Sequence, residues 1–240
     1  RSGQFRMIPL FDYVYHEFGP VRMDGWGKLV KEIGDLFYYN VARTYLWGGL
    51  YELNYEYSPM EALDGRETDP QEHYFHFEPQ GYAYDRNRAA YLGSFARARI
   101  GDAKPYWSYG RLMAQPKLQL PTKVYGWYHY NHDKHSPAYQ AGGDYPAPAV
   151  VSSLYRDEHG GFACFLANTS GESHRIPARM EDILPGVESA QAVLYRFDGQ
   201  GRTLIETDFG MQARDLGIIT LEPYALYMLK INTTERGPLS

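Results

Sequence analysis

The chain of 240 residues contains a single cysteine, Cys164, which excludes an intrachain disulfide. Cys164 lies within the apolar run of residues 161–166, and we expect it to be a small buried residue of a strand. Long apolar runs are also missing, because no segment reaches the roughly 18 residues that a membrane-spanning helix needs. We therefore expect no membrane partner.

Basic residues are not in excess either. The chain has 24 Lys and Arg against 29 Asp and Glu, a formal net charge of −5, and the basic residues form no stripe. This balance argues against nucleic acid as a partner. A glycine-rich phosphate-binding motif, a Gly-x-Ser-x-Gly elbow and a Cys-x-x-Cys pair are absent as well. These absences argue against a nucleotide-binding protein, a serine hydrolase and a thiol redox enzyme, and we expect no cofactor.

Aromatic residues are abundant. They make up 16% of the chain and include 23 tyrosines, within a composition that is 44% hydrophobic and 22% charged, as in a globular protein. Tyrosine suits half-buried strands, and it also suits sites that hold flat polar ligands such as sugars, because its ring packs while its hydroxyl group hydrogen-bonds. Both uses are open at this point.

The first part of the chain has the pattern of a parallel α/β protein. A near-continuous apolar run predicts a buried strand over residues 5–15, and three- and four-residue spacing predicts a helix over 28–44. A second strand is expected over 45–51, followed by a long loop over 54–82. Further along the chain, a short helix is expected over 106–113. A helix over 84–100 has an apolar face made of Ala89, Leu92, Phe95, Ala96 and Ile100.

The second part of the chain, beyond a change of composition around Pro116 to Pro121, has the pattern of an antiparallel sheet protein. Short β-type runs alternate with polar turns, as in a β-sandwich. Residues 216–222 and 223–231 are expected to form a closing pair of strands. The predicted strands cover residues 123–130, 149–155, 161–167, 190–197, 203–207, 217–221 and 225–231.

Two strand–helix units cannot close a parallel sheet, because they leave unpaired strand edges. Either another chain completes the sheet or the native protein continues on the N-terminal side, and we favour the second. The chain starts at Arg1 without an initiator methionine and reaches its first predicted strand within five residues. We interpret it as a fragment or a trimmed product, with the remainder of the sheet upstream.

The first predicted strand runs directly into Tyr15, His16 and Glu17. The carboxyl ends of buried parallel strands are where catalytic and binding groups collect, so this run is a candidate edge of an active site. His16 can hydrogen-bond a ligand, and Glu17 can act as an acid, a base or a transition-state stabiliser. The alternative is a structural pair that orients the next loop.

Three segments resemble the C-terminal third of glycoside hydrolases of the broad α-amylase and α-galactosidase style, and most closely a family of large bacterial hydrolase-like proteins. The first is residues 8–17, IPLFDYVYHE, similar to a late barrel strand that ends in His and an acid, although amylase-type enzymes have Asp where this chain has Glu17. The second is residues 91–99 and 106–113, similar to the last barrel helices. The third is residues 165–170 and 221–229, similar to a hydrolase C-terminal domain.

The resemblance implies a fold of the class α/β plus all-β: the last βα units of a (β/α)₈ barrel over residues 1–118, and an antiparallel β-sandwich over 119–240. It implies hydrolysis of glycosidic bonds of a carbohydrate substrate by a carboxylate pair. The main catalytic residues then lie upstream, the isolated chain is inactive, and a secreted or periplasmic location is favoured. The alternative is a carbohydrate-binding or structural module without catalysis.

Under this resemblance Glu17 is the candidate catalytic residue, and six residues are candidates for substrate binding. Asp24 and Trp26 are expected in the loop after the first strand, where Trp26 is either a platform for a sugar ring or an apolar plug. Trp47 and Glu52 are expected at the end of the second strand, where Glu52 is a possible second carboxylate. The binding candidates are Tyr15, His16, Asp24, Trp26, Trp47 and Glu52.

A metal site is not expected. His129, His132 and His135 recur every three residues around Asp133, a cluster that could bind a metal. A strand continuing into a loop would scatter these side chains, so we favour a solvated loop.

Overall fold

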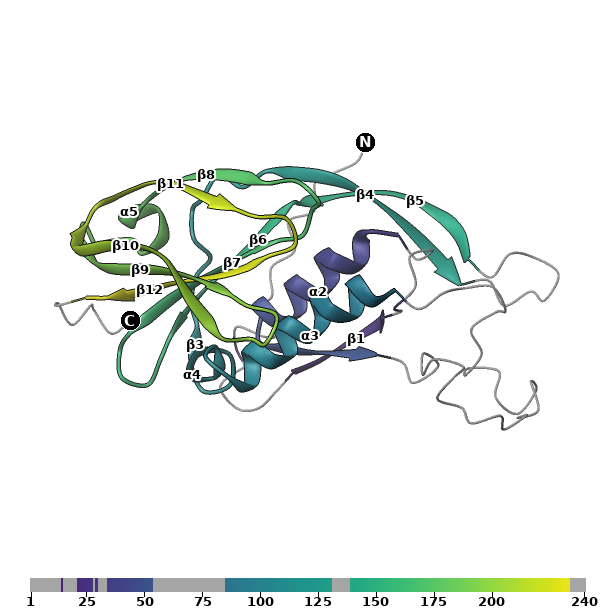
Figure 1. The fold of residues 1–240 in the computed structure, drawn as a ribbon, viewed down its shortest axis with the longest axis horizontal. Coiled ribbons are helices and arrows are strands. Elements are labelled where there is room, and N and C mark those ends of the chain that lie inside the picture. The colour runs from purple at the N-terminus through teal and green to yellow at the C-terminus, as the bar shows by residue number, and fades with distance from the viewer. Residues whose placement is uncertain are drawn as a thin grey trace.

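The structure is a computed structural model that describes residues 14, 21–27, 29, 34–53, 85–130 and 139–233. Helices and antiparallel strands make up most of this part of the chain (Figure 1). The helices are α2 (Leu36–Leu46), α3 (Arg86–Ile100), α4 (Lys104–Trp107) and α5 (Met180–Ile183). The strands are β1 (Val21–Gly27), β2 (Gly49–Leu53), β3 (Arg111–Leu112), β4 (Thr122–Tyr130), β5 (Tyr139–Pro148), β6 (Val150–Arg156), β7 (Phe162–Asn168), β8 (His174–Arg179), β9 (Ala190–Phe197), β10 (Thr203–Ala213), β11 (Asp215–Leu221) and β12 (Leu226–Asn232).

The centre of the molecule is a six-stranded antiparallel sheet in the order β10-β9-β12-β7-β6-β3. Its middle strand β7 is buried along its whole length, because both faces of the sheet are covered. Successive side chains alternate between the two faces. Ala163, Phe165 and Ala167 therefore face one hydrophobic cluster, and Phe162, Cys164 and Leu166 face the other.

One face of this sheet is covered by the antiparallel pair β8–β11 and by α5. Ile176 of β8, Ile219 of β11 and Met180 of α5 are buried there with the even-numbered side chains of β7. Cys164 is fully buried in this cluster, and its burial raises the pKa of the thiol to about 12. The prediction of a small buried residue in a strand is confirmed.

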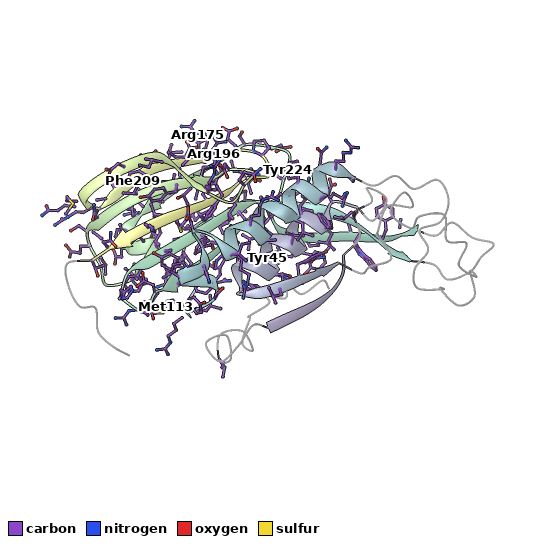
Figure 2. The ribbon with its side chains drawn as sticks, turned by 60° about the horizontal axis from the view of Figure 1, so that its bottom comes forward. Tyr45, Met113, Arg175, Arg196, Phe209 and Tyr224 are labelled. Atoms are coloured by element: carbon purple, nitrogen blue, oxygen red, sulfur yellow. The ribbon has the colours of Figure 1, made fainter. Side chains whose placement is uncertain are left out.

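The other face is covered by α2, α3 and α4. Phe165 of the sheet packs against Trp107 of α4, with ring centroids 4.7 Å apart, and Trp107 stacks on Phe95 of α3. The Tyr155 hydroxyl of β6 donates a 3.0 Å hydrogen bond to the Leu46 carbonyl at the end of α2. In Figure 2, Tyr45 of α2 lies in this helical layer, whereas Arg196 and Phe209 lie on strands.

The parallel pair β1–β2 lies on the far side of α2 and α3 from the six-stranded sheet (Figure 1). The order β1-α2-β2-α3 is a parallel βαβ unit followed by a second helix. Tyr51 of β2 packs against the same cluster as the helices. The fold is one of mixed helix and sheet whose strands are mostly antiparallel, and β1-α2-β2-α3 has a parallel α/β order. Its first strand is Val21–Gly27 and not the strand predicted over residues 5–15, which lies outside the described residues apart from Val14.

Three boundaries in the first part were predicted wrongly. Tyr45 and Leu46 end α2 and do not start a strand, because the helical spacing of buried residues continues through them to Gly48, whose φ of +81° ends the helix. α2 itself begins at Leu36, after Gly34 with a φ of +83°, and not at residue 28. The helix expected over 106–113 is α4 followed by strand β3.

Two further predictions, the buried face of α3 and the pairing of the last two strands, were wrong. Ile100 is 76% exposed at the end of α3, and the buried face of this helix is rotated toward Arg88, Tyr91 and Arg99. β11 and β12 do not form a closing pair, because β11 pairs with β8 and β12 pairs with β7 and β9. β5 and β8 were not predicted; each contains proline, which sheets accommodate at their edges.

Candidate functional site

The candidate site is built on the carboxyl ends of β1 and β2. The two strands are in register from Val21, opposite Gly49, to Met23, opposite Tyr51, and again at Gly27, opposite Leu53. Between these pairs β1 has three residues where β2 has one. Such a bulge bends and twists a strand, and bulges are frequent next to active sites.

This irregular segment contains three of the residues predicted from the sequence. Asp24 and Trp26 are two of the three residues on β1, and Glu52 is the single residue on β2. The placement of Asp24 and Trp26 in a loop was wrong, because both belong to strand β1. The backbone therefore brings Asp24, Trp26 and Glu52 together on neighbouring strands, which lie about 5 Å apart in a sheet.

Trp47 lies at the other end of β2. It follows α2 and precedes Gly49, the first residue of the strand, so its expected place at the end of the strand was wrong. Its ring is 4% exposed and lies 5.5 Å from the Arg43 guanidinium. Substrate binding by Trp47 stays a prediction.

The amino end of β2 is fixed by Arg99 of α3. Nη1 of Arg99 donates to the carbonyl oxygens of Gly48 at 2.9 Å and Gly49 at 3.2 Å. Burial lowers the pKa of the Arg99 guanidinium, opposed by the nearby Tyr155 and Tyr45. Because the buried Arg99 side chain satisfies two backbone carbonyl groups, it has a structural role at this end of the βαβ unit.

Tyr15, His16 and Glu17 lie outside the described residues. Glu17 precedes the first residue of β1 by four positions in the sequence. The role of these residues stays a prediction. The predicted loop over 54–82 lies outside the described residues too, as do His132 and His135. His129 belongs to β4, and no group of three His, Cys, Asp or Glu suited to a metal occurs in the described part of the chain.

The connections that leave β1 and β2 are held together where α3 begins. The backbone N–H of Asp85 donates to the carbonyl of Leu29, two residues beyond the end of β1. The Asp85 side chain caps α3 by accepting hydrogen bonds from the N–H groups of Asn87 and Arg88. The start of α3 is thus tied to the connection that follows β1.

Arg88 joins the first turns of the two long helices. Its side chain is 3% exposed, and Nη1 donates a 2.7 Å hydrogen bond to the Gly34 carbonyl. Nε lies 3.2 Å from Oδ2 of Asp85, and Nη2 lies 3.5 Å from Oδ1 of Asp35. Its guanidinium also lies 5.2 Å from the rings of Phe37 and Tyr38. We refer to Arg88 with Asp35 and Asp85 as the helix clamp.

The electrostatics of the clamp affect its aromatic neighbours. Burial raises the pKa of the Tyr38 hydroxyl to about 12, and the positive charge of Arg88 opposes this rise. Tyr38 therefore stays neutral and packs against Tyr224, with ring centroids 4.3 Å apart. Tyr224 has a φ of +54° and lies at the junction of strands and helices in Figure 2. The clamp thus belongs to the seam between the helical layer and the sheet.

Substitution of Arg88 with Met is expected to lower the free energy of unfolding by about 1–3 kcal/mol, because it leaves the Gly34 carbonyl unpaired and removes a buried ion pair. Asp35 and Asp85 are 49% and 21% exposed, so water compensates part of the loss. Urea unfolding followed by circular dichroism measures it. Arg86→Met, at an exposed position of the same helix, is the matched control. Equal stability of the two variants would contradict the role given to Arg88.

The β4–β5 hairpin also reaches this end of the molecule (Figure 1). Nζ of Lys123 in β4 lies 3.9 Å from Oδ2 of Asp35. Gly34 is so close to the carbonyl of Gly126 and the ring of Tyr128 that an added Cβ would collide with both. The connection between β1 and α2 is therefore packed directly against the middle of β4.

Comparison with known proteins gives only local likenesses. No protein-family model matches the chain, and no curated protein matches it. Among solved structures, the catalytic domain of GH30 xylanase C from Talaromyces cellulolyticus aligns with 46% of this chain at 14% identity and a TM-score of 0.28. CelM2, a bifunctional glucanase-xylanase protein from a metagenome library, aligns with 44% at 12% identity and a TM-score of 0.30. Both are glycoside hydrolases, and the alignments span 21% of each of their chains.

Sequence reasoning missed the residues that hold the site in place. Arg88 and Arg99 are not part of the predicted apolar face of their helix, yet both are buried. One signal for Arg88 was available: Asp85 stands immediately before the helix and Arg88 three positions later, the spacing of an N-terminal cap and its ion pair. Arg99 had no such signal, because its partners are carbonyl groups about fifty positions away.

In the described part of the chain, no helix has the length and apolar character to cross a membrane.

Proposed function

We propose that this chain is the C-terminal part of a carbohydrate-active enzyme that hydrolyses glycosidic bonds. In this proposal β1, α2, β2 and α3 are the last two units of a (β/α)₈ barrel whose other units lie upstream. The antiparallel strands are its C-terminal β-sandwich domain, with the division near residue 118. The proposal combines the resemblance of the sequence to glycoside hydrolases with the parallel βαβ unit.

The observation that supports the proposal most is the meeting of Asp24, Trp26 and Glu52 on β1 and β2, near the strands' carboxyl ends. In α/β barrels these ends form the mouth of the active site. Retaining glycosidases need two carboxyl groups about 5–5.5 Å apart, a spacing that neighbouring strands can provide. Trp26, on the same segment of β1 as Asp24, has an aromatic ring of the kind that suits the C–H face of a sugar.

The proposed roles follow from these positions. Asp24 and Glu52 are the candidate carboxylate pair on the described strands, and Trp26 is the candidate sugar platform. Glu17 and His16, with Tyr15, are proposed to contribute from the segment before β1, although the sequence predicted them at the end of the first strand. Trp47, at the amino end of β2, is proposed to have a structural role.

The partner of the parallel pair is proposed to be the upstream remainder of the barrel. Among the described strands, β1 and β2 pair only with each other. A two-stranded parallel sheet leaves two rows of unpaired backbone groups, which folded proteins cover with further strands, helices or loops. Six more strand–helix units would close the sheet into a barrel.

Activity of the chain and of its full-length parent tests this function. With a panel of nitrophenyl glycosides, we expect the parent protein to hydrolyse at least one substrate and the isolated chain of 240 residues to hydrolyse none. The chain would lack most of the barrel mouth, and so most of the groups that bind the transition state. Robust turnover by the isolated chain would overturn the fragment hypothesis. Glycan binding without hydrolysis by the parent would favour the alternative of a non-catalytic binding module.

A further inference from the structure

We propose that Arg88 and Arg99 are positioning residues: from the two ends of α3 they fix the stagger between β1 and β2, on which the meeting of Asp24 and Glu52 depends. This inference rests on the proposed function, and it assigns a role in catalysis to two residues outside the candidate carboxylate pair. It is carried by the hydrogen bonds of both arginines, by their burial and by the irregular pairing of the two strands.

The helix between the two strands is held at both of its ends by α3. α2 begins after Gly34 and ends before Gly48, and both glycines have a left-handed backbone, with φ of +83° and +81°. Arg88, in the first turn of α3, donates to the Gly34 carbonyl at 2.7 Å. Arg99, at the other end of α3, donates to the Gly48 carbonyl at 2.9 Å. The turns where the chain enters and leaves α2 are therefore both fixed to one helix.

The hydrogen bonds of α3 also reach the chain next to each strand. The carbonyl of Gly49, the first residue of β2, accepts from Arg99 at 3.2 Å. The carbonyl of Leu29, two residues beyond the end of β1, accepts a 2.6 Å hydrogen bond from the backbone N–H of Asp85. Asp85 is in turn paired with Arg88 at 3.2 Å. One helix thus holds the chain that leaves β1 and the start of β2.

Pairing between the strands does not fix their stagger by itself. The regular register is lost in the bulge after Met23 and resumes only at Gly27. Two-stranded sheets are marginal on their own, and a slip of one residue moves every side chain of a strand to the opposite face. The positions of Asp24 and Glu52 relative to each other therefore depend on what holds the ends of the βαβ unit.

The charge of Arg88 is unfavourable where it lies. A cation near the N-terminus of a helix is opposed by the helix dipole, which is positive there. Arg88 lies in the first turn of α3 and beside Asp35, the residue before α2, and its side chain is 3% exposed. It opposes the dipoles of two helices, and Asp35 and Asp85 balance its charge. Local rules are broken in this way at sites shaped by function as well as by stability.

Hydrogen exchange of the chain of 240 residues, followed peptide by peptide, tests whether the arginines hold the strands. We expect Arg88→Met to speed exchange about tenfold in peptides that cover β1 and Leu29, and Arg99→Met to do so in peptides that cover β2, because local opening becomes easier. Arg86→Met, exposed on the same helix, and Leu194→Ala, in the cluster on the opposite face of the six-stranded sheet, should leave these peptides unchanged. Unchanged exchange in both arginine variants would overturn the inference.

Kinetics of the full-length parent test whether the stagger matters for catalysis. Well below the melting temperature of each variant, we expect Arg88→Met and Arg99→Met each to lower kcat for a nitrophenyl glycoside by about 10- to 100-fold, the effect of a misplacement of about an ångström, with KM changed by less than about threefold. Leu194→Ala is the matched control, because it lowers the melting temperature and leaves kcat unchanged, as a merely structural role of the arginines would.

Unchanged kcat in both arginine variants of an active parent would overturn the inference, even where exchange is faster. Failure of the proposed function has a different signature. If the unmodified parent hydrolyses no glycoside, the proposed function falls and with it the catalytic role of both arginines, whereas faster exchange in the chain still shows that they hold the strands.

Discussion

Replacement of Trp107 with Ala is expected to lower the free energy of unfolding by about 3–5 kcal/mol, the usual cost of removing a large buried aromatic side chain. Trp107 is fully buried where three elements meet. Its ring is stacked on Phe95 of α3, with centroids 6.3 Å apart and planes at 5°, and lies 6.1 Å from Tyr45 of α2. On the other side it packs on Phe165 of β7. The substitution therefore opens a cavity at the junction of the helical layer and the six-stranded sheet.

Chemical denaturation measures this loss of stability, and two comparison variants show whether it comes from the lost ring. Trp107→Phe keeps an aromatic ring and removes the indole N–H, which has no hydrogen-bond partner among the described residues. Because an unpaired buried donor is itself unfavourable, we expect Phe to cost less than half as much as Ala. Tyr109→Ala, at an exposed position, should change stability by less than about 0.5 kcal/mol. A loss below about 1 kcal/mol in Trp107→Ala, or separate transitions for helices and sheet, would show that the two layers are not one cooperative unit.

Substitution of Glu52 with Gln in the full-length parent is expected to lower kcat by about 10²- to 10⁴-fold, the range that one general acid or base contributes. Glu52 lies on β2 opposite the bulged segment of β1 that contains Asp24. Gln keeps the size of the side chain and removes its charge and its proton. The melting temperature should stay within a few degrees of that of the parent, so that lost activity reports chemistry.

Matched variants separate the candidates for the carboxylate pair. Asp24→Asn and Glu17→Gln show whether the partner of Glu52 lies on β1 or before it. Glu206→Gln is the control, because this exposed carboxylate pairs with Arg196 on the sheet, away from β1 and β2. If Glu52→Gln keeps activity within twofold of the parent's, Glu52 is not part of the pair. If all three candidate variants stay active, the catalytic residues lie wholly upstream.

The sequence predicted the sheet better than the helices and connections around the site. Alternation of apolar and polar residues, and near-continuous apolar runs such as that of β7, depend on local geometry alone, so β6, β7, β9 and β12 were found within one or two residues. The end of α2 was misplaced because Tyr45, Leu46 and Trp47 suit a buried helix and a buried strand equally. Only Gly48, with its positive φ, decides between them.

The candidate site could be predicted only in part, for a related reason. Asp24 and Trp26 were predicted in a loop and Glu52 at a strand end, and the backbone places all three on the neighbouring strands β1 and β2. Their assembly depends on a register shift between β1 and β2, which no local pattern encodes. The burial of Arg88 and Arg99 depends on carbonyl groups from distant segments.

The most direct test of the central claim is a crystal structure of the full-length parent protein. The account predicts that β1 and β2 are joined on both sides by further parallel strands into a closed barrel, with Asp24 and Glu52 at its mouth and the β4–β5 hairpin on its rim. A parent in which β1 and β2 remain a separate pair, or in which the upstream chain folds as an independent domain, would contradict it.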